Sequence, residues 1–205
     1  MGGLDWQAIE SAKLDSCPFD HVAIKQVLSA HCASALPLEY PAIRSPGSFS
    51  LADAPPGPAL AALIEDLRSP RFRAQMERIF GLDLEGRPAV VTLRGQCSSR
   101  DGRIHTDSRS KILSLLLYLN AGWVDGAGQL RLLRNGSDIE SHTVEIPASL
   151  GSMVVFRRGD HSWHGHTPFI GERRVLQMNY LQSSRDSLVG ALRHRLSAFA
   201  KQRVA

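Results

Sequence analysis

The stretch GRIHTDSRSKILSLLLYLN, residues 102–120, joins a polar loop to a strongly apolar run. The apolar part, residues 110–120, is shorter than the roughly 20 residues needed to cross a bilayer. It is better interpreted as a buried β-strand. Because side chains alternate along a strand, the odd-numbered leucines 113–119 share one face. The opposite, more polar face carries Ser114, Leu116, Tyr118 and Asn120. We expect the leucine face to pack against another sheet or against helices.

Short β-rich runs surround this strand and continue to residue 181. Gly, Asn, Asp and Pro residues separate them, as is typical of strands joined by turns. The other runs span residues 88–96, 128–135, 142–148, 151–158 and 173–181. At least six strands in under 100 residues predict a double-stranded β-helix, a jelly-roll or cupin-like barrel.

Helical patterns flank the expected strands on both sides. Apolar spacing predicts a helix over residues 18–36, with Asp20 as its N-cap, followed by a proline-rich loop over 37–58. Two short helices follow at 59–67 and 71–80, the second ended by Gly81. A last helix is expected after residue 183. The chain is thus predicted to be mainly β with flanking α, a single domain. Its parts are a helical N-terminal support (1–86), a β-barrel core (87–182) and a C-terminal helix (183–205).

Composition restricts the class of protein. Hydrophobic residues make up 43% of the 205 and charged residues 21%, as is usual for a soluble globular protein. The net charge of +4 is scattered rather than gathered in a basic stripe, which makes a nucleic-acid partner unlikely. Three cysteines without paired spacing argue for reduced thiols. With no signal peptide and no membrane span evident, we expect a cytoplasmic protein. Its oligomeric state is not indicated.

One set of residues has the composition of a metal site. His105 and Asp107 are two positions apart, so in an extended segment their side chains point the same way. Two histidines and one carboxylate on one face of iron(II) leave positions open for other ligands. The segment GDHSWHGHTPF, residues 159–169, offers a third ligand in His161, His164 or His166. Strand parity places His166 on the same side as His164, so it is the main alternative.

Residues 88–182 resemble the 2-oxoglutarate and iron(II)-dependent oxygenase superfamily, and within it the prolyl-4-hydroxylase-like group. HTD at 105–107 matches the family's first metal motif, and YLN at 118–120 matches the strand that follows. GAGQLRLL at 126–133 is similar to the family's GG-x-L segment, with Ala127 replacing one glycine.

The segment WHGHTPFIGERRVLQ, residues 163–177, is similar to the family's distal motif. In that motif a histidine, a proline four residues later, a glycine and an arginine recur. The resemblance selects His164 as the third metal ligand and aligns Pro168, Gly171 and Arg173 with the motif. It implies a β-barrel that binds Fe(II), 2-oxoglutarate and O2, with ascorbate as a candidate reductant.

The resemblance also implies a site for the far carboxylate of 2-oxoglutarate. A buried dicarboxylate needs a fixed cation, and the planar fork of Arg suits a carboxylate. Strand alternation puts Arg173 and Arg174 on opposite faces, and the family's spacing from the distal histidine favours Arg173. Tyr118 matches a tyrosine whose hydroxyl binds the same carboxylate in similar hydroxylases; a core tyrosine bonded to backbone is the alternative.

The activity implied is hydroxylation of an unactivated C–H bond, with release of succinate and CO2. The presence of Asp107 favours hydroxylation over halogenation, whereas demethylation and desaturation would use the same ligands. We expect a small-molecule or peptide substrate. Two other functions are compatible with the residues. One is a cupin-like metalloprotein of another reaction class, which would not need Arg173 or Tyr118. The other is a non-catalytic barrel that senses 2-oxoglutarate or metal.

Overall fold

The computed structural model describes residues 2–124 and 126–183, whose strands form two sheets. The larger sheet has six strands in the order β1-β7-β4-β9-β3-β2, and the smaller has three in the order β6-β5-β8. The strands are β1 (His21–Ile24), β2 (Phe49–Ser50), β3 (Ala89–Cys97), β4 (Lys111–Tyr118), β5 (Leu130–Leu133), β6 (His142–Ile146), β7 (Met153–Arg157), β8 (His164–Gly165) and β9 (Gly171–Leu181). The predicted mainly β, jelly-roll class is confirmed, although the described strands pair into two sheets rather than one closed barrel.

The apolar run of residues 110–120 becomes β4, in the interior of the larger sheet. It pairs antiparallel with β7 on one side and with β9 on the other. Leu115 lies opposite Val155 of β7 and Met178 of β9. A strand with neighbours on both edges and cover on both faces has little contact with water, which explains its apolar sequence.

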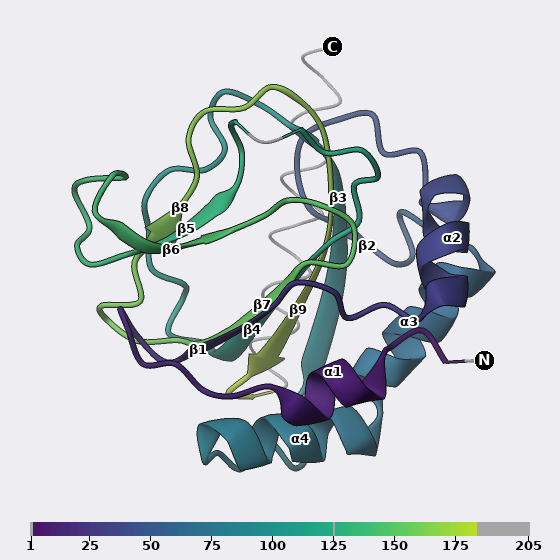
Figure 1. Ribbon diagram of the computed structural model, residues 1–205, viewed down its shortest axis with the longest axis horizontal. Helices are drawn as coiled ribbons and strands as arrows, with labels where there is room; N and C mark the ends of the chain where they lie inside the picture. Colours follow the sequence, from purple (N-terminus) through teal and green to yellow (C-terminus); the bar gives the residue numbers. More distant parts are fainter. Residues whose placement is uncertain (1, 125, 184–205) are drawn as a thin grey trace.

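Four helices lie against one side of the larger sheet, and the smaller sheet lies on the other (Figure 1). The helices are α1 (Trp6–Ser11), α2 (Ala30–Glu39), α3 (Pro58–Arg68) and α4 (Pro70–Phe80). The two helices predicted before Gly81 are present as α3 and α4. The Ser69 hydroxyl caps α4 by accepting from the Phe72 amide, and Gly81 ends it at φ 60° in the left-handed region. No helix within residues 2–124 and 126–183 is long and apolar enough to cross a membrane.

The helix predicted over residues 18–36 is wrong. His21–Ile24 instead forms β1, which pairs with β7 at the edge of the larger sheet. Helix α2 begins only at Ala30, after the Ser29 cap, and continues through Pro37 into the segment expected to be a loop. The reason is tertiary. The backbone groups on the free edge of β7 offer hydrogen bonds that the local apolar spacing does not reveal. The predicted C-terminal helix, 183–205, lies outside the described residues except for its first position.

Each face of the larger sheet is covered by its own apolar cluster. On the helix side, the leucines of β4 pack with residues of β9, β3 and the helices, among them Leu60, Leu63, Phe72 and Met76. On the other side, Tyr118, Val154, Phe156 and Val175 pack against Leu130, Leu132 and Ile146 of the smaller sheet. The predicted leucine face is thus covered by helices. The polar face of β4 looks into the space between the two sheets.

Candidate metal centre and its cavity

His105, Asp107 and His164 come together between the sheets. One ligand atom from each side chain lies within 4.8 Å of the others. The backbones of the two histidines also pair. The amide of each donates to the carbonyl of the other, both at 3.0 Å. Their ring centroids are 4.3 Å apart. Strand β8, which the sequence did not predict, therefore holds His164 beside the His105–Asp107 loop through these backbone hydrogen bonds.

Each histidine of this group is oriented by its own backbone neighbourhood. The Nδ1 atom of His105 lies 2.8 Å from the carbonyl oxygen of Arg103, and that of His164 lies 2.9 Å from the carbonyl oxygen of Ser162. A ring whose Nδ1–H donates to a carbonyl presents an unprotonated Nε2 as the ligand atom. Both imidazoles thus have the tautomer that metal binding requires.

Asp107 is buried and held by two side chains. The Lys111 ammonium lies 2.6 Å from one carboxylate oxygen, and the Ser114 hydroxyl donates to the other. The Ser114 hydroxyl also lies 3.0 Å from the side-chain carbonyl oxygen of Asn179, which completes this polar group. Burial alone would raise the pKa of Asp107, but Lys111, His164 and the hydrogen bonds outweigh it and leave the pKa below its usual value. The carboxylate is therefore ionised at neutral pH.

The charge of His164 also suits a ligand. Burial disfavours the imidazolium and lowers the pKa of His164 to about 4, although the Asp107 carboxylate acts in the opposite direction. His164 is thus neutral at physiological pH, and its Nε2 lone pair is available. His105, in contrast, is exposed. The group therefore combines one solvent-accessible side chain with two buried ones.

A cavity of about 300 Å³ contains this group and reaches Arg173 on β9. Arg173 is only 5% exposed. Its Nε donates to the Gly128 carbonyl at 2.7 Å, and one terminal nitrogen donates to the Tyr118 hydroxyl at 3.2 Å. These contacts leave part of the guanidinium available to an anion in the cavity. Arg173 and the three converging side chains line one space.

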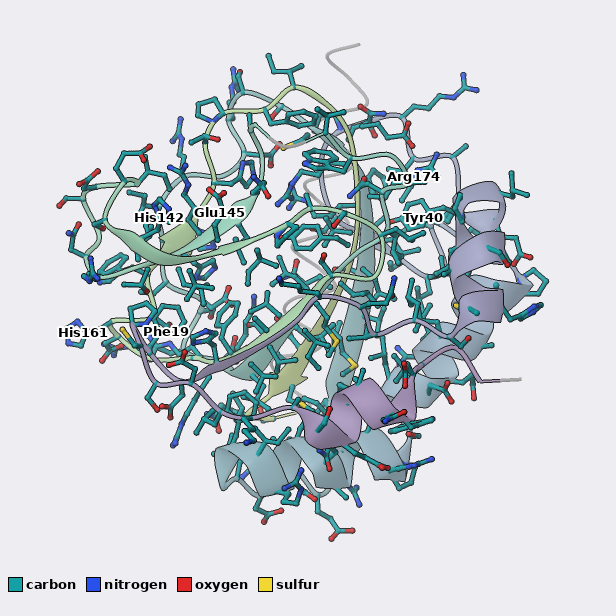
Figure 2. The ribbon with its side chains drawn as sticks, in the orientation of Figure 1. Phe19, Tyr40, His142, Glu145, His161 and Arg174 are labelled. Atoms are coloured by element: carbon teal, nitrogen blue, oxygen red, sulfur yellow. The ribbon has the colours of Figure 1, made fainter. Side chains whose placement is uncertain are left out.

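Arg174 lies away from that cavity, on the opposite face of β9 from Arg173, as strand parity predicted for the pair. Its guanidinium pairs with Glu172, donates to the Pro37 carbonyl at 2.9 Å and lies over the Tyr40 ring. Figure 2 shows Arg174 beside Tyr40, on the side of α2. The two neighbouring arginines thus lie in different surroundings: Arg173 is inside the jelly roll and Arg174 is at its outer edge.

Tyr118 lies behind Arg173 and is fully buried. It packs among the apolar residues between the sheets and does not itself line the cavity. Burial raises the pKa of the Tyr118 hydroxyl, and the nearby Arg173 guanidinium lowers it only in part. The hydroxyl therefore keeps its proton. Because it accepts a hydrogen bond from Arg173, its own proton remains available for a second partner.

The two rival histidines do not join the converging group. His166 is buried, but its Nδ1 lies 2.8 Å from the Thr167 carbonyl and its Nε2 lies 3.9 Å from the Cys97 sulfur. His161 is exposed and lies at the outer edge of the molecule (Figure 2). Among the residues that the structure describes, the only set of His, Cys, Asp or Glu side chains placed to share one ion is His105, Asp107 and His164.

Several contributors to the site were not predicted from the sequence. Lys111 was not singled out, and Ser114 was only placed on the polar face of its strand. Arg94 of β3 and Asp101 were also missed; they line the cavity and form an ion pair at 2.6 Å. The alternation of β3 contains a signal for Arg94, since it shares one face with Thr92 and a charged side chain on a strand needs polar surroundings.

Comparison with known proteins agrees with this geometry. Residues 96–181 match the family model of the 2OG-Fe(II) oxygenase superfamily. A comparison with curated protein sequences gives no significant match.

Among solved structures, the chain is similar to a prolyl-4-hydroxylase from Pseudomonas putida, at 20% identity and a TM-score of 0.56, covering 80% of this chain and 92% of the other. It is also similar to a Trichoplax adhaerens prolyl hydroxylase in complex with a hypoxia inducible factor peptide fragment, at 18% identity and a TM-score of 0.58, covering 82% and 86%. A third similar structure is a viral collagen prolyl hydroxylase from Paramecium Bursaria Chlorella virus-1 in its 2OG complex, at 12% identity and a TM-score of 0.53, covering 80% and 96%.

The fold, the converging side chains and the matched segment define an oxygenase domain. Residues 96–181 are similar to the 2OG-Fe(II) oxygenase superfamily, whose members use Fe(II), 2-oxoglutarate and O2. The matched segment supports a 2-oxoglutarate-dependent dioxygenase, and the fold is shared with prolyl hydroxylases.

Proposed function

We propose that His105, Asp107 and His164 hold iron(II), and that Arg173 with Tyr118 binds the far carboxylate of 2-oxoglutarate. The chain would then hydroxylate an unactivated C–H bond of a small molecule or a peptide side chain, releasing succinate and CO2. The observation that carries the proposal is the placement of three oriented ligand groups and one buried arginine in the same cavity.

The donor set fits iron(II). Two imidazoles and one carboxylate are the donor set of non-haem iron oxygenases, which leaves positions for co-substrate and oxygen. When bound, the iron and 2-oxoglutarate supply the oxidising chemistry, while the protein supplies orientation. Lys111 and Ser114 hold the Asp107 carboxylate in place. Arg173 would anchor one end of the 2-oxo acid while its other end lies at the ligand group.

The buried surroundings also contribute. Leu116, Leu130 and Val175 line the cavity beside the polar groups and limit the entry of water. Their apolar walls strengthen the pairing of Arg173 with a carboxylate, because charges interact more strongly where water is excluded. A peptide substrate is supported by the fold shared with a prolyl hydroxylase in complex with a peptide fragment. A small molecule is supported by the modest size of the cavity.

The test is iron-dependent conversion of 2-oxoglutarate to succinate by the purified chain, measured by mass spectrometry. We expect turnover with Fe(II), none with Zn(II), and a loss of turnover in His105→Ala. Turnover of another substrate with Zn(II) or Mn(II), independent of 2-oxoglutarate, would instead identify a cupin-like enzyme of a different reaction class. Tight binding of both metal and 2-oxoglutarate with no succinate under any condition would favour a sensing barrel.

A further inference from the structure

The cavity has more cationic groups than the proposed co-substrate needs. Its lining includes Arg94, Arg100, Arg103 and Arg173, against two carboxylates, Asp101 and Asp107. The first carboxylate is paired with Arg94, and the second with Lys111. The charge of iron(II) would be balanced by that of the 2-oxoglutarate dianion. Three arginines then remain, of which Arg173 is assigned to 2-oxoglutarate.

Arg100 and Arg103 are therefore the cations without an assigned anion. Both are exposed, and neither side chain forms an ion pair with any residue in 2–124 or 126–183. They lie on the loop that leads into His105, at the accessible side of the ligand group. A solvated charge on a surface loop needs no partner. Two such charges lining a reaction cavity, however, raise the local concentration of anions.

The loop that carries these arginines is held in place by several contacts. Asp101 accepts hydrogen bonds from the amide and hydroxyl of Ser98 at 2.7 and 2.8 Å, in addition to its pair with Arg94. The amide of His166 donates to the Gly102 carbonyl at 2.9 Å.

Gly102 has a φ of 84°, and a Cβ there would lie 2.4 Å from the His166 ring. Only glycine fits this close approach. His166 thus packs directly against the loop at Gly102. Because the loop between Ser98 and His105 is anchored at both Asp101 and Gly102, the two arginines are presented at a defined place.

We infer that Arg100 and Arg103 bind an anionic group, carboxylate or phosphate, of the primary substrate and so orient its C–H bond toward the metal. The substrate class is a small anionic molecule. This inference rests on the proposed function and narrows it. A guanidinium pair suits either anion, because it donates several hydrogen bonds in a plane. A neutral substrate would leave both charges unused.

The test uses three probes that share a methyl group: methylphosphonate, acetate and neutral acetamide. The full chain is loaded with Mn(II) in place of iron and saturated with 2-oxoglutarate, and proton relaxation of each methyl group is measured. A paramagnetic ion accelerates relaxation only of nuclei held close to it, and a Zn(II) sample provides the diamagnetic blank. We expect saturable enhancement for the anions and none for acetamide.

Two variants decide whether the arginines cause this binding. The double variant Arg100→Gln/Arg103→Gln should weaken anion binding by about fivefold to thirtyfold, since exposed ion pairs contribute up to about 1 kcal/mol each. The matched control Arg68→Gln removes an exposed arginine at the end of α3 and should bind as the wild type does. Stronger enhancement for methylphosphonate than for acetate would identify a phosphate group, and the reverse order a carboxylate.

Two results would overturn the inference. One is equal enhancement for acetamide and the anions. The other is an unchanged response in the double variant, which would mean that the anion simply ligates the metal. If Mn(II) does not bind at all, the proposed metal site has failed. The anion site is then decided by calorimetric titration of methylphosphonate into wild type and double variant without metal, where equal affinities would refute it.

Discussion

The two faces of the larger sheet use the same strands for different purposes. Toward the helices, β4 and β9 present Leu115, Leu117 and Met178, all buried in one apolar cluster. Toward the smaller sheet, the same two strands present Ser114 and Arg173, which contact the candidate site. In β4 and β9, side chains therefore stabilise the fold on one face and position the polar groups of the site on the other.

Removing a charge from the cavity face should have the largest effect on metal binding. Asp107→Ala should reduce affinity for Fe(II) by more than the roughly 10- to 100-fold typical of losing a supporting residue of a metal site. The reason is that a ligand, and the only carboxylate of the group, is lost. Mn(II) titration followed by electron paramagnetic resonance measures the effect. Asp83→Ala, an exposed carboxylate elsewhere, is the control; equal affinities in the two variants would contradict the assignment.

Neighbouring leucines of β4 offer a direct contrast between the faces. Leu117→Ala creates a cavity on the helix side and should lower the free energy of unfolding by about 2–5 kcal/mol without changing metal affinity per folded molecule. Leu116→Ala, on the cavity face and only half-buried, should cost less stability and disturb 2-oxoglutarate turnover more. Urea unfolding and succinate release measure the two quantities, and an identical pattern in both variants would remove the distinction.

The adjacent arginines of β9 should also respond differently to substitution. Arg173→Ala should weaken 2-oxoglutarate binding by about 2–3 kcal/mol, roughly 30- to 150-fold, because it leaves a buried carboxylate without its cation. Arg174→Ala removes only contacts with Glu172, Pro37 and Tyr40 and should leave that affinity nearly unchanged. Calorimetry of the metal-loaded protein distinguishes them. The reverse order would place the co-substrate on the other face of β9.

The smallest expected effect is a pH dependence that arises on the cavity face. Burial, assisted by the Arg173 guanidinium, lowers the pKa of His166 from 6.5 to about 4. Between pH 6.5 and about 4, His166 therefore binds a proton in the unfolded chain but not in the folded chain. Stability is lost as pH falls below about 6.5, by about 1.4 kcal/mol at pH 5.5. Urea unfolding of the metal-free protein at pH 5.5 and 7 measures this loss.

His166→Asn should remove that part of the acid sensitivity. An unchanged difference between pH 5.5 and pH 7 in the variant would mean that His166 is not the group responsible. Between pH 7 and pH 8 the imidazole is neutral in the folded chain and mostly neutral in the unfolded chain, so this histidine should contribute only about 0.1 kcal/mol there. The helix-side cluster contains no histidine among its described members, so we expect its packing to add nothing to this acid effect.

Much of the fold was predictable because local patterns and tertiary environment agree. The six predicted strands are present as β3, β4, β5, β6, β7 and β9, and the two helices before Gly81 are α3 and α4. Where the two disagree, the prediction fails. Apolar spacing favoured a helix around His21, but the free edge of β7 recruited those residues into β1. Short β2 and β8 exist only through pairing and leave no periodic signal.

The alternation of β4 and β9 could be read from the sequence, and with it the placement of Arg173 and Arg174 on opposite faces; the choice of Arg173 as the inward one came from the family resemblance. The sequence also determined the residue types of a metal group, because the two-residue spacing of His105 and Asp107 is local. Only the tertiary structure brought His164 to that pair, assembled Lys111 around the carboxylate, and set Arg100 and Arg103 at the cavity. The reason is physical: face parity follows from neighbouring peptide units, whereas convergence across many residues depends on how strands pair and pack.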